Sequence, residues 1–68
     1  MNERMLKEEL KKRGITTAEM CNKIGLSRSA FYRKCKGITE FTLSEINKIV
    51  TVIGSEAASN IFFAGMVS

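Results

Sequence analysis

The sequence of 68 residues contains no histidine, no proline and no tryptophan, and only two cysteines. A structural zinc site needs about four nitrogen or sulfur ligands, so this inventory argues against one. The lack of histidine also removes the commonest general base of enzymes, and no paired carboxylates or phosphate-binding loop take its place. We therefore expect no metal, no cofactor, no small-molecule ligand and no catalytic activity.

Long hydrophobic runs are missing as well. No stretch approaches the roughly 18 apolar residues that a membrane-spanning helix needs. Charged residues occur within the first four positions and no apolar run follows them, so we expect neither a secretory signal nor contact with a membrane. The apolar content of 44% is nevertheless typical of a folded domain.

Positive charge is concentrated in the middle of the chain, which has a formal net charge of +4. Between Met20 and Thr39 there are five basic residues and no acidic one, whereas three acids and one lysine follow Thr39. A basic centre of this kind indicates a polyanionic partner. The alternative interpretation is a solvated helix face that happens to be basic.

Helix-capping residues and apolar spacing predict a compact all-α fold of five helices. Thr16 with Glu19, and Thr42 with Glu45, have the spacing of capping boxes, which begin helices. Apolar residues recur at intervals of three and four, as expected for helices with one buried stripe. The predicted helices cover residues 2–13, 17–24, 28–36, 43–53 and 56–63.

The second half of the chain supplies the clearest helical period. The apolar residues from Leu43 to Ile53 are predicted to form the spine of the core. In the loop before them, Ile38 and Phe41 are apolar in a polar setting, so both are predicted to fold back over the core. Ser55 is predicted to cap the last helix.

Residues 16–37 have the pattern of two short helices joined by a tight turn. Gly25 can end the first helix in the left-handed conformation, and Ser27 can cap the second helix through its hydroxyl. Phe31 and Cys35, four residues apart, would turn one side of the second helix inward. A short helix pair with a basic, polar second helix is typical of a helix-turn-helix.

The pattern is carried by Ile15-Thr16-Thr17, Ala18-Glu19-Met20-Cys21, Gly25-Leu26-Ser27-Arg28-Ser29, Phe31, Arg33 and Gly37. It resembles the lambda-repressor/Cro-like (XRE-type) family of helix-turn-helix DNA-binding domains, which occur in phage and prophage regulators. The resemblance covers roughly residues 3 to 63. Four positions depart from the usual pattern of that family: Thr17 stands where glutamine is frequent and Cys21 where alanine is usual. Lys34 occupies a commonly aliphatic position and Cys35 one that is often glutamate.

The helix over 28–36 is the predicted recognition helix. In helix-turn-helix proteins the first residues of the second helix meet base edges in the major groove. Arginine can bind guanine bidentately, so Arg28 is the first candidate and Arg33 the second. Tyr32 can instead be partly buried beside Phe31. The predicted base contacts are Arg28, Ser29, Tyr32 and Arg33.

Phosphate contacts need hydroxyl or backbone donors at helix starts and flexible cations. Lys34 has an alternative placement, in which its stem lies on the core and only its ammonium meets solvent. The predicted contacts to the DNA backbone are Thr16, Thr17, Ser27, Lys34 and Lys36.

The end of the chain is unusually apolar for a surface segment. In the resembled family the C-terminal helix and tail often form a dimer contact, which implies the same role here for Ile61, Phe63, Met66 and Val67. The alternative is that these residues only close a small core.

Cys21 and Cys35 lie on predicted inward faces, so we interpret them as small buried hydrophobic residues. A disulfide between the two helices is conceivable in geometry. A DNA-binding protein would, however, work in a reducing compartment, which disfavours this bond.

The predicted function is that of a sequence-specific regulator of transcription that binds double-stranded operator DNA as a homodimer, like a Cro protein or phage repressor. We expect it in the cytoplasm, at the bacterial nucleoid or in a phage-infected cell. Residues 1–68 are expected to be one domain, either a whole regulator or the N-terminal domain of a longer repressor. The alternative function is a protein-interaction module of antitoxin or anti-repressor type; RNA binding ranks lower and an enzyme lowest.

Overall fold

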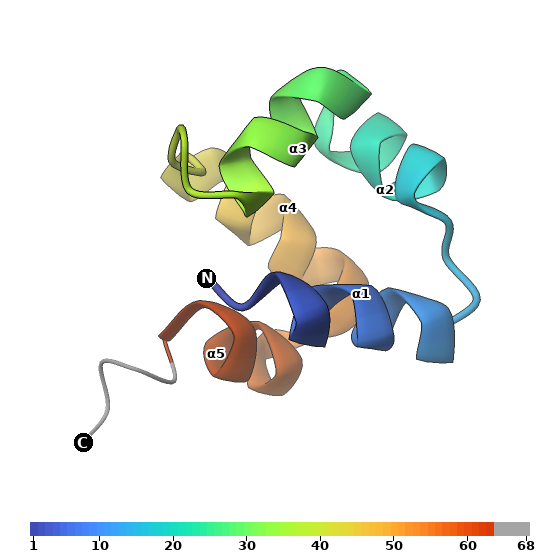
Figure 1. Cartoon of the computed structure of the whole chain (residues 1–68). Coiled ribbons are helices and arrows are strands. Elements are labelled where there is room, and N and C mark those ends of the chain that lie inside the picture. The colour runs from blue at the N-terminus through green and yellow to red at the C-terminus, as the bar shows by residue number, and fades with distance from the viewer. Residues whose placement is uncertain (64–68) are drawn as a thin grey trace.

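The computed structural model describes residues 1–63 as five α-helices joined by short turns and loops (Figure 1). They are α1 (Glu3–Lys12), α2 (Thr17–Ile24), α3 (Arg28–Cys35), α4 (Leu43–Ile53) and α5 (Ser55–Phe63). No strand occurs in this part of the chain, so the predicted all-α class with five helices is confirmed. None of the five helices is long and apolar enough to cross a membrane.

Polar side chains begin four of the helices by accepting a hydrogen bond from a backbone N–H of the first turn. These N-cap residues are Asn2, Thr16, Ser27 and Thr42. The carboxylates of Glu19 and Glu45 also accept from the backbone N–H of Thr16 and Thr42, at 3.1 and 2.8 Å, so both predicted capping boxes are confirmed. These hydrogen bonds hold the pKa of Glu19 and of Glu45 below its usual value.

Three helices end in a Schellman motif, in which a glycine takes the left-handed conformation. The glycines are Gly14, Gly25 and Gly37, with φ of 69°, 74° and 80°. The residue after each glycine donates its N–H to a carbonyl five positions earlier: Ile15 to Leu10, Leu26 to Cys21 and Ile38 to Arg33.

The third of these motifs explains why the prediction for Ile38 is wrong. Ile38 does not fold back over the core, since 67% of its surface is exposed. Ile15 and Leu26 pack against the core because the residues they return to, Leu10 and Cys21, are buried. Ile38 returns to an exposed arginine and finds no such apolar contact.

One glycine separates the last two helices. The N–H of Gly54 closes α4 on the carbonyl of Val50 at 2.7 Å, and its carbonyl accepts from Ala58 at 3.1 Å to open α5. Gly54 therefore takes the position before the helix that was predicted for Ser55, and Ser55 is the first residue of α5. Its backbone, with φ of 88° and ψ of 157°, lies outside the region that other residues adopt readily.

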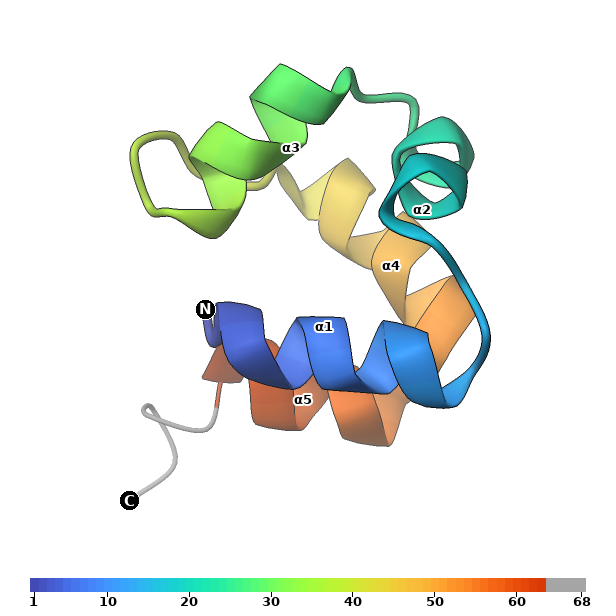
Figure 2. The ribbon, with the colours of Figure 1, turned by 45° about the vertical axis from the view of Figure 1, so that its right-hand side comes forward.

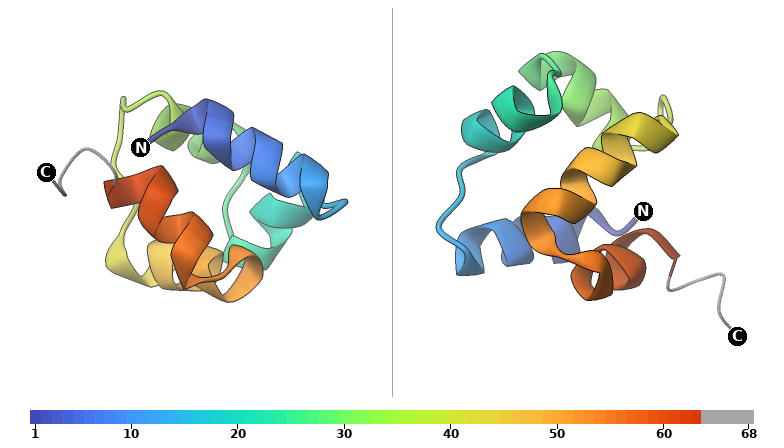
Figure 3. Two further views of the ribbon diagram at one scale, coloured as in Figure 1. Left: turned by 90° about the horizontal axis from the view of Figure 1, so that it is seen from below. Right: turned by 180° about the vertical axis from the view of Figure 1, so that it is seen from behind.

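The helices are arranged as two pairs, one at each end of the molecule, and α4 connects the pairs. α2 packs on α3 at one end, and α1 lies along α5 at the other (Figure 1, Figure 2). α4 packs on both α2 and α5, and the view from behind shows it running from one end to the other (Figure 3). The N–H of Asn2 donates to the carbonyl of Ile61 at 2.8 Å, which fastens the start of the chain to α5.

Every helix contributes two or three side chains to a single core. The buried apolar residues are Leu6, Leu10, Met20, Cys21, Ile24, Phe31, Cys35, Ile49, Ile53, Ala58 and Ile61. Both cysteines are free, so their interpretation as small buried hydrophobic residues is confirmed. Burial raises the pKa of the Cys35 thiol to about 11 and also raises that of Cys21.

The predicted spine of the core begins later in α4 than expected. Ile49 and Ile53 are buried and Ile46 is half-buried, but 74% of Leu43 is exposed. At about 100° per residue, each step of three residues back from Ile49 turns the side chain by about 60°. Two such steps carry Leu43 about 120° away from the buried stripe and onto the surface.

The loop between α3 and α4 is held to the core by an aromatic residue. Phe41 is half-buried and meets Phe31 and Phe62 edge to face, with ring centroids 6.0 and 5.6 Å apart. The prediction that Phe41 folds back over the core is therefore confirmed. Such edge-to-face contacts contribute about 0.5–1.5 kcal/mol beyond the burial of area.

Arg13 joins the end of α1 to the end of α4. Its Nε donates to Oε2 of Glu9 at 2.6 Å, and its Nη2 donates to the carbonyl oxygen of Ile53 at 2.7 Å. The carbonyls of the last helical turn have no partner within the helix, so the second bond satisfies one of them. The side chain thus connects two helix ends whose residues, Arg13 and Ile53, are 40 positions apart in the sequence.

We predict that Arg13→Ala lowers the free energy of unfolding by about 1–2 kcal/mol, because a carbonyl at a helix end loses a charged donor. Arg4→Ala is the matched control. Arg4 is exposed and pairs only along α1, with Glu8 at 3.3 Å, so its loss should change stability by less than about 0.5 kcal/mol. Urea denaturation followed by circular dichroism measures both, and equal effects would contradict the prediction.

Candidate nucleic-acid interface

A tight turn sets the angle between α2 and α3. Gly25 has φ of 74° and ψ of 30°, and the N–H of Leu26 closes the turn on the carbonyl of Cys21 at 3.0 Å. Leu26 is half-buried and packs against the core, so it anchors the turn. Ser27 then begins α3 by accepting from the N–H of Ala30 at 3.1 Å. The roles of Gly25 and Ser27 agree with their predictions from the sequence.

The predicted base contacts share the exposed side of α3, because the opposite side is in the core. Phe31 and Cys35 are buried, and at about 100° per residue Ser29 and Arg33 point away from them. Within residues 1–63, neither Arg28 nor Arg33 forms an ion pair with a carboxylate. Both guanidinium groups therefore keep their donors for another partner. The four exposed residues are Arg28, Ser29, Tyr32 and Arg33.

An open hollow of about 710 Å³ lies beside α3. It is bordered by the start of α1 with Glu3 and Lys7, by Thr17 at the start of α2, and by α3 itself. All four predicted base contacts and one predicted phosphate contact therefore line the same hollow. Its lining comes from three helices, of which only α2 and α3 belong to the helix-turn-helix, and its charged residues lie on α1 and α3.

Lys36 lies on this side of the molecule but is paired with a carboxylate. Its Nζ is 2.8 Å from Oε1 of Glu3 and 5.4 Å from the centroid of the Tyr32 ring. The hydrogen bond between the two groups holds the pKa of Glu3 below its usual value and raises that of Lys36. Ion pairs at the surface are weak, so a phosphate can take the place of Glu3. The carboxylate of Glu3 would then lie close to that phosphate.

Sequence reasoning missed the role of Glu3. Its spacing to Lys7 predicts a pair within α1, and that pair is present at 3.6 Å. Lys36 is 33 residues further on, and only the packing of the helices brings it to Glu3. No local pattern in the sequence signals this contact.

Lys34 does not point toward the outer side of α3. Its Nζ lies 2.9 Å from the carbonyl oxygen of Glu40 and 3.0 Å from Oε1 of Glu45, and its side chain is 14% exposed. This placement corresponds to the alternative in which the stem lies on the protein, except that the ammonium also has two oxygen partners in the protein. The geometry gives no support to the predicted phosphate contact.

The three predicted hydroxyl contacts lie at the starts of α2 and α3. The hydroxyl oxygens of Thr16 and Ser27 already accept backbone N–H groups as N-caps. A hydroxyl has one donor as well as its acceptor sites, so both can still donate to a phosphate oxygen. Thr17 is half-buried at the first position of α2. The Glu19 carboxylate occupies one N–H of the same helix start and opposes a phosphate there.

The residues predicted for the dimer contact divide into three groups. The prediction for Ile61 is wrong. Ile61 is 3% exposed and belongs to the core, and its carbonyl accepts a hydrogen bond from the N-cap residue of α1. Phe63 is 42% exposed at the end of α5 and is open to a partner. Met66 and Val67 lie outside the residues that the structure describes.

Two helices joined by a tight glycine turn, the second with an exposed basic side, define a helix-turn-helix domain. Residues 5–55, more than half of the chain, match the family model of the Cro/C1-type helix-turn-helix DNA-binding domain. The chain therefore belongs to this family, which confirms the resemblance to lambda-repressor/Cro-like domains. Its general role is DNA binding in the regulation of transcription, in a family that is typically not enzymatic. No curated protein and no solved structure matches the chain.

We predict that Glu3→Gln strengthens binding to random duplex DNA, because it releases Lys36 and removes a negative charge beside the phosphates. Affinity should rise at every salt concentration while the slope of log affinity against log salt stays nearly the same, because Lys36 reaches the same phosphate in both proteins and the variant has no ion pair to break first. Glu8→Gln makes the same change of charge on another side of α1, where the carboxylate pairs with Arg4, and serves as the control. Equal affinities of Glu3→Gln and wild type for random duplex in fluorescence anisotropy would contradict the prediction.

Proposed function

We propose that the chain is a sequence-specific regulator that places α3 in the major groove of a double-stranded operator, as a Cro protein or phage repressor does. The observation that carries this proposal is the position of Arg28 and Arg33 on the exposed side of α3, unpaired with any carboxylate of residues 1–63. Arginine binds O6 and N7 of guanine bidentately. Ser29 and Tyr32 complete the reading surface. Such a regulator acts in the bacterial cytoplasm, on nucleoid or phage DNA.

Phosphate contacts on both sides of α3 would fix its register on the duplex. Thr16, Thr17 and Ser27 would donate from the starts of the two helices, and Lys36 would reach a phosphate after leaving Glu3. These contacts carry no sequence information themselves, and they set which bases the two arginines meet.

We also propose that two chains bind a two-fold operator. Phe63 supports this, because a large aromatic side chain at the end of α5 is 42% exposed. With Met66 and Val67, which follow it in the sequence, it supplies apolar side chains that a partner would cover. A dimer would space its two recognition helices by one helical turn of DNA, about 34–36 Å.

A protein partner is the second candidate function. Two large apolar side chains, Ile38 in the loop after α3 and Leu43 at the start of α4, are 67% and 74% exposed. Side chains of this kind are typical of protein-protein contacts when they form one patch. DNA binding has the stronger support, because the family model describes a DNA-binding domain.

We predict that Arg28→Ala weakens binding to a site selected from random DNA by about 1–3 kcal/mol, the energy of a bidentate contact, and weakens binding to random duplex much less. Lys36→Ala is the contrast, since a phosphate contact should weaken both DNAs alike and reduce the salt slope by about one unit. Anisotropy titrations at stated salt measure both. The base-reading role is refuted if Arg28→Ala keeps the full preference, and the proposed function is refuted if wild type ignores duplex DNA in dilute buffer.

We predict that the complex with a selected two-fold site contains two chains, and that Phe63→Ser lowers affinity for that site while leaving affinity for an isolated half-site unchanged. The reason is that an apolar contact between chains couples the two half-sites but touches no DNA. Sedimentation equilibrium gives the stoichiometry, with half-site DNA as the control. One chain per two-fold site would rule out the dimer.

A further inference from the structure

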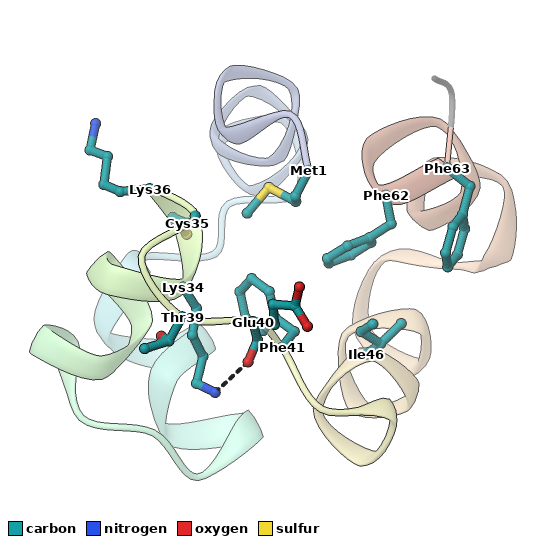
Figure 4. A pocket seen from close by; sticks show the side chains of 11 residues that line it. Met1, Lys34, Cys35, Lys36, Thr39, Glu40, Phe41, Ile46, Phe62 and Phe63 are labelled. Carbon is teal, nitrogen blue, oxygen red and sulfur yellow. Dashed lines mark hydrogen bonds between the residues drawn. The ribbon is translucent and has the colours of Figure 1, made fainter. Parts of the chain in front are cut away.

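Lys34 is unusual because its side chain is only 14% exposed although it ends in a charge. Lysine is almost never buried unless it is paired. Here the ammonium lies between the carbonyl of Glu40 and the carboxylate of Glu45, which is itself only 15% exposed. It also lies 5.9 Å from the centroid of the Phe41 ring. Figure 4 shows the side chain leaving the end of α3 and reaching the loop before α4.

The same carboxylate oxygen serves the start of α4. Oε1 of Glu45 accepts from the N–H of Thr42 at 2.8 Å as well as from Lys34 at 3.0 Å. One atom therefore joins the capping box of α4 to the last turns of α3. The carbonyl of Glu40 adds a third point, in the loop between the two helices. The Lys34 ammonium, the Glu45 carboxylate, the N–H of Thr42 and the carbonyl of Glu40 are together called the Lys34 cluster.

The end of α3 depends on such side-chain links, because the helix is not closely packed on α4. α3 packs on α2, whereas α4 packs on α2 and α5. Beyond the buried Phe31 and Cys35, the links from this end of α3 are the Phe31–Phe41 contact, the Lys36–Glu3 pair and the Lys34 cluster. Of the three, the Lys34 cluster reaches the start of α4, through two side chains that are 14% and 15% exposed.

We propose that Lys34 is a positioning residue for DNA recognition, which sets the tilt of α3 relative to α4 and does not itself touch DNA. The neighbouring Arg33 lies on the exposed side of the same turn, so a change of tilt moves its guanidinium relative to the bases. This inference rests on the proposed function. It replaces the phosphate contact expected for Lys34 from the sequence.

The two roles make opposite predictions for Glu45. If Lys34 acts through Glu45, then Glu45→Gln weakens operator binding, because the ammonium loses the charged one of its two partners. If Lys34 contacts a phosphate, Glu45→Gln leaves binding unchanged or strengthens it, because it frees the lysine and removes an acid. Glutamine also satisfies a capping box, so α4 keeps its start in this variant. Lys34→Met keeps an unbranched stem of similar length without the charge.

The experiment measures affinity for a selected site and for random duplex DNA as a function of salt, for Lys34→Met, Glu45→Gln and the double variant, which keeps the wild-type net charge. We expect each single variant to lose about tenfold in affinity for the selected site, as for one mismatched base pair. The double variant should lose no more than either, because coupled residues are not additive. Its affinity for random duplex and its salt slope should equal those of wild type.

Lys48→Met is the control for an exposed lysine of the fold, and it should leave both affinities unchanged. Residual dipolar couplings of the DNA-free protein add a readout that does not depend on function, since the axis of α3 should tilt relative to α4 in Lys34→Met. Glu45→Gln carries the test if Lys34→Met does not fold.

Three results would overturn the inference. The first is an unchanged angle between α3 and α4 in the variants. The second is a loss confined to Lys34→Met with a salt slope smaller by about 0.9, which would indicate a phosphate contact. The third is wild-type affinity and preference in all variants. If the wild-type protein does not bind duplex DNA, the proposed function itself is refuted. The three results above can each occur in a protein that does bind DNA, so the two failures are distinguishable.

Discussion

Phe31 and Cys35 lie one turn apart on α3, and both are in the core. Burying two residues at this spacing fixes the rotation of a short helix about its own axis, so every other side chain of α3 has its direction decided. Arg28, Ser29 and Arg33 are exposed for this reason. Rotation alone leaves the tilt of the helix undetermined. Tilt is set at the two ends, by the Leu26 turn at the start of α3 and by contacts to the loop, α1 and α4 at its end.

The acidic residues are placed so that they do not neutralise the positive charge of the arginines of α3. Glu19 and Glu45 complete capping boxes, and Glu9 holds Arg13 against the end of α4. These carboxylates serve helix ends, where backbone N–H groups and cations stabilise them. Within the described chain, Glu3 alone meets a cation on the outer side of α3, and its partner is Lys36 rather than an arginine. The positive field of the reading surface is thus reduced at one edge and kept at its centre.

Features that depend on neighbours in sequence were predictable, and those that depend on packing were not. The capping boxes, the Gly25 turn and the buried side of α3 follow from spacing within about five residues, and the structure has them all. Ile38 and Leu43 were misplaced because apolarity says nothing about whether a buried neighbour lies within reach. The contacts of Lys34 and Lys36 reach loops and helices whose positions follow from the tertiary fold. Charge and position in the helix therefore predict which residues form the proposed reading surface, but they do not predict which side chains fix the orientation of α3.

The lysine at position 34, where the resembled family commonly has an aliphatic residue, changes how the end of α3 is held. An aliphatic side chain would stabilise the end of α3 through contact area, which is not directional and tolerates small shifts of one helix over another. An ammonium between a carbonyl and a carboxylate is directional, because each hydrogen bond weakens steeply when its angle changes. With 14% of its side chain exposed, Lys34 gives up part of its hydration, which the two oxygen partners replace, and removing either partner weakens the hold on the ammonium. The exchange therefore replaces adaptable packing with a defined angle, at the helix that we propose enters the major groove.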